Sequence, residues 1–151
     1  MACGSVFGDN KRFFWNLDGN VGPGCPNKIE DVQLVQLGFH CKANNPKYPI
    51  TPASKAIYSA VVPGAPYTGG YNDPLSIAIR QFQKERGGPQ DGRVSVISGS
   101  GMISDKLGFM MVALNNNISD CITNNWPFID RHSQCPGALK AVVGRSFVFS
   151  S

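Results

Sequence analysis

The chain has 151 residues, of which 17 are glycine and 11 are proline. Because both residues interrupt regular helices, this content excludes a coiled coil or a series of long unbroken helices. Charged residues make up only 16% of the chain, with 14 Lys and Arg against 10 Asp and Glu. The positive charges form no cluster, so we expect no nucleic-acid partner.

The chain contains no run of about 20 apolar residues, so we expect no membrane span. Five cysteines in a chain of this length are typical of an oxidising compartment, which predicts a periplasmic or extracellular, cell-wall-associated protein. Residues 1–15 are polar and lack the apolar segment of a signal peptide, so the export route stays open.

Four of the cysteines form two pairs that are local in the sequence, Cys25 with Cys41 and Cys121 with Cys135. Disulfides within these pairs are one hypothesis, although four cysteines allow three connectivities. Small buried thiols are the alternative.

The N-terminal residues 1–24 carry turn signals and predict an irregular arm, in which Phe13-Phe14-Trp15 supplies packing. The first helix is predicted to follow Asn27, which stands three residues before Glu30 as in a capping box. Its expected buried face comprises Ile29, Val32, Val35, Gln36 and Phe39. Gly38 is expected near its end.

A long connection follows over residues 42–70, and its five prolines exclude a continuous helix. Within it, Ala53–Val62 is compatible with a short helix or a strand. A loop of this length in a small domain is usually functional or an insertion.

The next segment has the clearest helical pattern in the chain. Asp73 is a predicted N-cap and Pro74 the first helical residue, where a missing N–H is harmless. The apolar stripe that follows predicts a helix, and Gly87-Gly88-Pro89 ends it. Asp91-Gly92 predicts a tight turn, followed by a short extended run over Arg93–Ile97.

A third helix is predicted from a Ser104 cap to the asparagines at 115–117. The remaining residues, 118–151, predict a loop-rich tail. Within that tail, Ala138–Val143 predicts a turn of helix and Arg145–Phe149 a short strand.

Two of the predicted helices share a pattern, which reads DVQLVQ at Asp31–Gln36 and AIRQFQ at Ala78–Gln83. With Asp91-Gly92 after the second helix and the lead-in Val21–Gly24, the chain resembles the peptidoglycan-binding domain family, a group of small three-helix modules of bacterial wall enzymes. The resemblance covers about residues 21–117. The chain departs from the family where a compact turn should precede the second helix, because the long Pro/Gly connection replaces it.

The resemblance implies a mainly α fold, a three-helix bundle with a Pro/Gly-rich inserted loop. The domains would be an arm over 1–20, the binding domain over 21–117 with its insertion at about 42–70, and a cysteine-containing tail over 118–151. The implied function is non-catalytic binding of peptidoglycan or its stem peptide, which would target or anchor a secreted or injected protein. The first alternative is an adaptor that binds another protein of a bacterial secretion or phage-like machine. The second is a small wall hydrolase or toxin that uses Cys41 or Cys135.

Six residues are candidates for ligand binding, namely Gln36, Tyr67, Tyr71, Arg80, Gln83 and Arg93. The tyrosines could stack on sugars, and the arginines could bind a carboxylate in a bidentate contact. Five of the six candidates also have a structural alternative: the glutamines could satisfy loop backbone, Arg80 could lie on a solvated helix face, and the tyrosines could hold the long loop.

The residues point to no catalytic constellation and no cofactor. His40 adjoins Cys41, and His132 lies three residues before Cys135, but neither spacing matches a known nucleophile signature. A zinc site built from these four residues and Cys25 lacks any CxxC or HxxxH pair. The sequence therefore predicts neither an enzyme nor a metal site.

Overall fold

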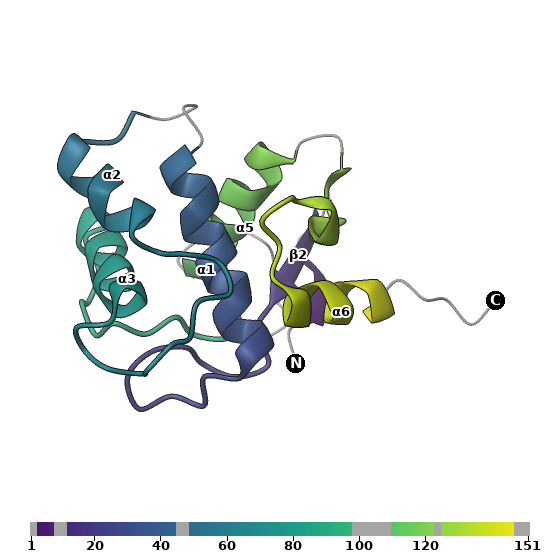
Figure 1. Cartoon of the computed structure of the whole chain (residues 1–151), viewed down its shortest axis with the longest axis horizontal. Helices are drawn as coiled ribbons and strands as arrows, with labels where there is room; N and C mark the ends of the chain where they lie inside the picture. The colour runs from purple at the N-terminus through teal and green to yellow at the C-terminus, as the bar shows by residue number, and fades with distance from the viewer. Residues whose placement is uncertain (1–2, 8–11, 45–48, 98–109, 123–124, 147–151) are drawn as a thin grey trace.

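The computed structural model describes residues 3–7, 12–44, 49–97, 110–122 and 125–146. The protein is mainly helical in these residues, as the sequence predicts (Figure 1). Of the described helices, none is long and apolar enough to cross a membrane.

The N-terminal segment is a β-hairpin, so the prediction of an irregular arm is wrong. Strand β1 (Cys3–Phe7) pairs antiparallel with β2 (Arg12–Asn16), and Cys3 lies opposite Asn16. Phe14 and Trp15 are both buried although they point to opposite sides of β2. The hairpin is covered on both faces, because β2 contacts α5 (Met110–Cys121) and β1 contacts α6 (Gly137–Ser146).

Helix α1 (Ile29–Asn44) is the centre of the molecule, and α2, α5 and α6 all pack against it (Figure 1). A helix that is surrounded in this way is apolar on nearly its whole circumference. Its buried apolar residues are Val32, Leu34, Val35, Leu37, Phe39, Cys41 and Ala43.

Both predicted ends of α1 need correction. Asn27 is not its cap: it adopts a left-handed φ of 53°, and its side chain bonds to both backbone groups of Gly22. Ile29, which was expected on the buried face, is 60% exposed. Gly38 does not end the helix, which continues to Asn44. A Cβ at Gly38 would lie 2.9 Å from Cδ2 of Leu114 in α5, so this glycine permits close approach of the two helices.

The long connection contains a helix, α2 (Pro52–Ser59). Of the short helix and the strand that the sequence allows for Ala53–Val62, the structure therefore has the helix. The Thr51 hydroxyl accepts from the backbone N–H of Ser54 and caps its N-terminus. The segment that leaves α2 runs over α1 before it enters α3 (Figure 1).

Helix α3 (Pro74–Glu85) agrees closely with the prediction. The Asp73 carboxylate accepts from Leu75 N–H at 2.9 Å, and Pro74 is the first helical residue. The side chains of Leu75 and Phe82 are buried as part of the apolar stripe. Local signals at both ends therefore suffice to define this helix.

A buried tyrosine connects α2 with α3. Tyr58 stacks on Phe39 of α1 with ring centroids 5.5 Å apart, and its hydroxyl donates to the Glu85 carboxylate. Ser54 Oγ donates to the other oxygen of Glu85 at 2.7 Å. Burial, reinforced by the negative charge of Glu85, raises the pKa of Tyr58 above its usual value.

The raised pKa of Tyr58 predicts a loss of stability in alkali. The folded protein keeps this phenol protonated, whereas the unfolded chain releases the proton above about pH 10, so the contribution is complete below pH 10 and decreases above it. We expect Tyr58→Phe to reduce the slope of unfolding free energy against pH by up to about 1.4 kcal/mol per pH unit. Urea unfolding between pH 8 and 11 measures this slope. Tyr71→Phe, at an exposed tyrosine, is the matched control, and equal slopes for the two variants would contradict the prediction.

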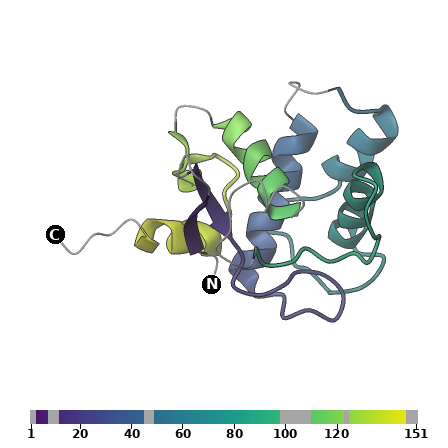
Figure 2. The same cartoon turned by 180° about the vertical axis from the view of Figure 1, so that it is seen from behind.

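Helix α5 (Met110–Cys121) is the described part of the predicted third helix, and it continues past the asparagine run instead of ending there. The predicted cap, Ser104, lies outside the described residues. Seen from behind, α5 lies along α1 (Figure 2). Asn115 is fully buried and bonds to both backbone groups of Trp15, which attaches β2 to α5.

The tail contains a short 3₁₀ helix, η2 (Ile129–Arg131), and helix α6. The Gln33 side chain on α1 accepts from Leu139 N–H at 2.8 Å and so satisfies a donor in the first turn of α6. The strand predicted over Arg145–Phe149 is wrong at Arg145 and Ser146, which are helical. Its remaining residues lie outside the described part of the chain.

Candidate functional site

Gln36, the candidate glutamine of α1, forms hydrogen bonds to the inserted loop. Gln36 is buried, its Nε2 donates to Ala65 O at 2.9 Å, and its Oε1 accepts from Gly64 N–H at 3.0 Å. The side-chain amide thus satisfies one backbone donor and one backbone acceptor of the loop, as a neighbouring strand would. Gln36 therefore holds the loop.

Gln83 of α3 does the same for the turn after its own helix. Its Oε1 accepts from Gly92 N–H at 2.9 Å, and its Nε2 donates to Asp91 Oδ1 at 2.8 Å and to Arg93 O at 3.0 Å. Asp91 also accepts from the backbone N–H of Arg93, and these hydrogen bonds help to lower its pKa. Gln83 is therefore a structural residue as well.

The turn that Gln83 holds is attached to the segment before α1. Val21 and Val94 form an isolated antiparallel bridge with N···O distances of 3.0 and 2.7 Å. Gly22, at φ 141°, packs so closely on this turn that a Cβ would lie 2.4 Å from Gly92 O. Only glycine fits at this position.

Tyr67 is partly buried and bonds within the fold. Its hydroxyl lies 2.7 Å from Ser76 Oγ on α3, and Ser76 is buried. Burial raises the pKa of Tyr67. The tyrosine therefore fixes the loop to α3, which is the structural alternative for this residue.

Tyr71 and Arg80 form an exposed pair. The Arg80 guanidinium lies over the Tyr71 ring, with Cζ 3.6 Å from the ring centroid, and Nη1 donates to Tyr71 O at 2.7 Å. Tyr71 nevertheless stays 65% exposed. A guanidinium held on an aromatic face fixes the ring at a low cost in conformational entropy and leaves its remaining surface for contacts.

The turn that carries Arg93 lies beside Arg80. A Cβ at Gly92 would approach Arg80 Cγ at 3.5 Å, and a Cβ at Gly24 would approach Arg93 Nη2 at 3.8 Å. The two arginines therefore flank the same turn. We refer to Tyr71, Arg80 and Arg93 together as the Tyr71 patch.

Two hollows lie near the candidate residues. One has a volume of about 310 Å³ and is lined by Gln83, Arg86, Gly88, Pro89, Asp91, Arg93, Ser95 and Met110. The other, of about 360 Å³, separates the start of α1 from the inserted loop and is lined by Asn27, Ile29, Val32, Gln33, Gly64, Ala65, Pro66 and Tyr67. Arg93 belongs both to the first hollow and to the Tyr71 patch.

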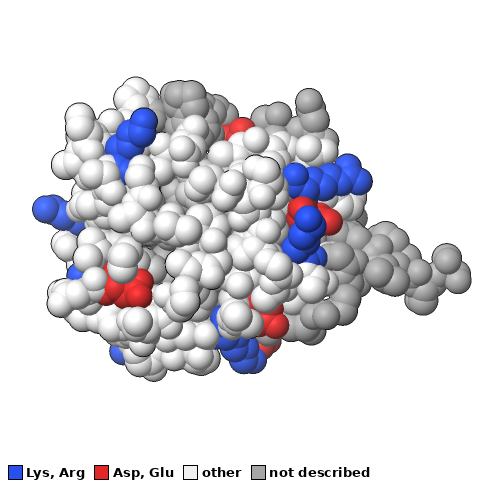
Figure 3. Space-filling view, viewed as in Figure 1, with Lys and Arg blue, Asp and Glu red and all other residues white. Residues whose placement is uncertain are grey.

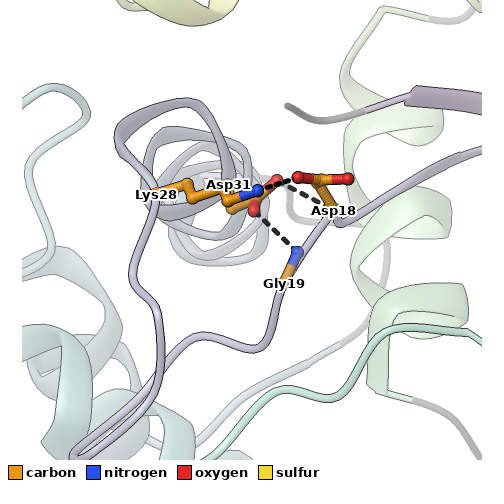
Figure 4. A network of polar contacts seen from close by, with 4 residues as sticks. All are labelled: Asp18, Gly19, Lys28 and Asp31. Carbon is orange, nitrogen blue, oxygen red and sulfur yellow. Dashed lines mark hydrogen bonds and ion pairs between the residues drawn. The ribbon is translucent and has the colours of Figure 1, made fainter.

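A buried carboxylate supports the loop before α1 (Figure 4). Asp31 accepts from Asp18 N–H at 3.1 Å and from Gly19 N–H at 3.0 Å, while Lys28 forms an ion pair with the Asp18 side chain. Burial raises the pKa of Asp31. The hydrogen bond from Lys28 lowers the pKa of the exposed Asp18 to about 2. Asp31 of the DVQLVQ pattern therefore organises the backbone.

The cysteines are not arranged as their sequence spacing suggests. Cys25 precedes α1 and Cys41 lies in its last turn, and the rise from Ile29 to Cys41 along the helix is about 18 Å. Since bridged cysteines need Cα atoms within about 7 Å, a Cys25–Cys41 disulfide does not fit the fold. Cys41 lies instead beside Cys121 of α5. Cys25, Cys41, Cys121 and Cys135 are free thiols in the structure.

The two candidate nucleophiles are not activated. Cys41 is fully buried, and its hydrogen bond with Cys121, together with burial, raises its pKa. Burial raises the pKa of Cys135 to about 11, so little thiolate is present at neutral pH. Burial also lowers the pKa of His40 and His132, and the charge of His40 adds to the effect on His132. The geometry does not favour a thiolate nucleophile.

The structure also brings together three possible metal ligands whose positions in the sequence do not predict a common site. Cys41, Cys121 and His132 come from two helices and the tail. Cys121 was absent from the residues considered for zinc, because ligands this far apart carry no spacing signal.

Comparison with known proteins found no matching protein-family model, no matching curated protein and no matching solved structure.

Proposed function

We propose that the protein binds bacterial peptidoglycan without catalysis, through the Tyr71 patch. The observation that carries the proposal is the exposed Tyr71 ring with the Arg80 guanidinium stacked on it and Arg93 nearby. A fixed aromatic ring suits the apolar face of a sugar, and two guanidiniums suit the carboxylates of a stem peptide. The wall polymer presents both groups side by side.

The two glutamine contacts are a second support. The DVQLVQ and AIRQFQ segments each place a final glutamine on the backbone of a glycine-containing loop, at Gly64 and at Gly92. Equivalent roles for equivalent residues agree with a three-helix module of the family that the sequence resembles. We include this bundle in the proposal, with α1, α3 and α5 as its helices.

We expect the purified protein to co-sediment with intact peptidoglycan sacculi. Tyr71→Ala and Arg80→Gln should each weaken binding about tenfold, which corresponds to the loss of one stacking or charge-assisted contact. Lys55→Gln, on the exposed side of α2, removes the same charge outside the patch and should bind like the wild type. Binding should also decrease between low and moderate salt, since the arginines contribute charge.

Absence of co-sedimentation at low salt would contradict the proposal. Equal loss in the Lys55 control would show that overall charge, and not the Tyr71 patch, causes retention. In that case the Tyr71 patch would lose its role.

A second candidate function is an adaptor for another protein. Ile29 and Val62 are 60% and 59% exposed, and Ile29 lines the hollow beside the inserted loop. Figure 3 shows that charged side chains lie mainly around the edge of the face on which this loop crosses α1, and the centre is uncharged. A stable complex with a host protein, together with no binding to sacculi, would select this function.

A further inference from the structure

Both histidines of the chain and two of its cysteines lie together at one end of the helix pair α1 and α5. The Sγ atoms of Cys41 and Cys121 and a ring nitrogen of His132 all lie within 4.8 Å of one another. The ring of His40 packs edge-to-face on that of His132, with centroids 5.6 Å apart. These residues are far apart in the sequence, so tertiary packing alone brings them together.

The chemistry of the three ligand atoms selects the metal. Two thiolates and one imidazole are soft to borderline ligands, which suit Zn²⁺ and not Ca²⁺ or Mg²⁺. In a tetrahedral zinc site two sulfur ligands lie about 3.8 Å apart. The three ligand atoms lie at most 4.8 Å apart, so a movement of about 1 Å or less brings any two of them to the distance of a zinc site.

The surroundings of the three residues suit a cation. Cys41 is buried, whereas Cys121 and His132 are partly exposed, so this group of ligands is shielded and still accessible. Cys41 lies in the last turn of α1 and Cys121 is the last residue of α5. The C-terminal ends of helices carry partial negative charge, and here both helices end at the ligands (Figure 1).

The other polar contacts of the ligands are weak or replaceable. Cys121 Sγ donates to Cys41 O at 3.6 Å, and Gln134 N–H donates to His132 Nδ1 at 3.0 Å. Metal binding breaks the hydrogen bond from Gln134 N–H to His132 Nδ1 whichever ring nitrogen coordinates. If Nδ1 binds the metal, its lone pair is used there; if Nε2 binds the metal, Nδ1 carries the ring proton and cannot accept. Metal binding thus includes a small rearrangement of the turn between His132 and Gln134.

We propose that Cys41, Cys121 and His132 bind Zn²⁺, with a fourth position open to water. On binding, the two thiols lose their protons to solvent, and the two thiolates neutralise the charge of the ion. A disulfide between Cys41 and Cys121 would use the same sulfurs but would give the nearby imidazole no role. This inference is independent of peptidoglycan binding.

Titration of the reduced full chain with Co²⁺, a spectroscopic substitute for Zn²⁺, tests the site. We expect one equivalent of Co²⁺ to give a thiolate-to-cobalt charge-transfer band in the near ultraviolet and the visible bands of a tetrahedral ion. Excess Zn²⁺ should remove both. The intensity of the charge-transfer band should correspond to two thiolates.

Variants assign the ligands. Cys121→Ser should halve the charge-transfer band and weaken binding about 100-fold or more, and His132→Ala should shift the visible bands and weaken binding similarly. Both residues are partly exposed, so circular dichroism should show folded variants. Cys25→Ser and Cys135→Ser are the matched controls and should titrate like the wild type.

Three results would overturn the proposal. One is the absence of a charge-transfer band in the reduced wild type. Another is its loss in either control variant. The third is a mass 2 Da below that of the reduced chain in protein purified without reductant, with a Cys41–Cys121 bridge and no Co²⁺ uptake after reduction.

Discussion

Replacing Asn115 with alanine is expected to lower the free energy of unfolding by about 3–4 kcal/mol. The Asn115 amide accepts from Trp15 N–H at 2.7 Å and donates to Trp15 O at 2.8 Å and Met111 O at 2.7 Å, and Asn115 and Trp15 are fully buried. Alanine removes all three of these buried hydrogen bonds, two of which hold the backbone of Trp15. Each unsatisfied buried group costs about 1–3 kcal/mol.

Urea unfolding of the wild type and the variant measures this difference. Asn72→Ala, at an exposed asparagine, is the matched control and should change stability by less than about 0.5 kcal/mol. Asn115→Asp should also be destabilised, because its second oxygen would face the carbonyl oxygens of Trp15 and Met111. If Asn115→Ala were as stable as the Asn72 control, the attachment of the hairpin to α5 would not depend on this amide.

Replacing Gly38 with valine is expected to cost about 3 kcal/mol. A Cβ at this position would lie 2.9 Å from Leu114 Cδ2 and 3.0 Å from Leu114 Cβ, and Leu114 is fully buried. Valine adds two further methyl groups to this contact. Since the surrounding core is closely packed, α1 and α5 would have to separate.

A double-mutant cycle with Leu114→Ala tests the contact. Leu114→Ala alone leaves a cavity and should be destabilising by about 2–5 kcal/mol. In the double variant the valine side chain occupies part of that space, so the combined loss should be smaller than the sum by about 1–3 kcal/mol. Gly88→Val is the control, because a Cβ at Gly88 has no atom within 4 Å. Additive losses at positions 38 and 114 would contradict the proposed close contact.

The repeated pattern in the sequence has a structural meaning that its amphipathic character does not show. Gln36 and Gln83 each follow a buried residue on a helix, and each bonds to the backbone of a loop. The loop held by Gln36 lies far along the chain, whereas the loop held by Gln83 comes directly after its own helix. The sequence is compatible with ligand binding or with loop support for both residues. In the structure both amide atoms of each side chain bond to loop backbone.

The features that could be predicted from the sequence alone are local ones. The mainly helical class and the start of α3 follow from signals within one helical turn, such as Asp73 before Pro74. Capping and the missing proline N–H act on adjacent backbone groups, so they operate before distant parts of the chain meet. For the same reason the predicted helix over 74–86 needed almost no correction.

Only the tertiary structure decided the features that depend on distant partners. Gly38 resembles a helix end in the sequence, but helix α1 continues through it, and the missing side chain lets Leu114 of α5 approach closely. The aromatic run at Phe14 and Trp15 is a strand because it pairs with Cys3–Phe7, and Asn115, 100 residues away, bonds to the backbone of Trp15 and attaches this strand to α5. Cys41, Cys121 and His132 meet for the same reason, since the packing of α1, α5 and the tail places them together. Burial and close packing are summed over the whole chain, and no short pattern records them.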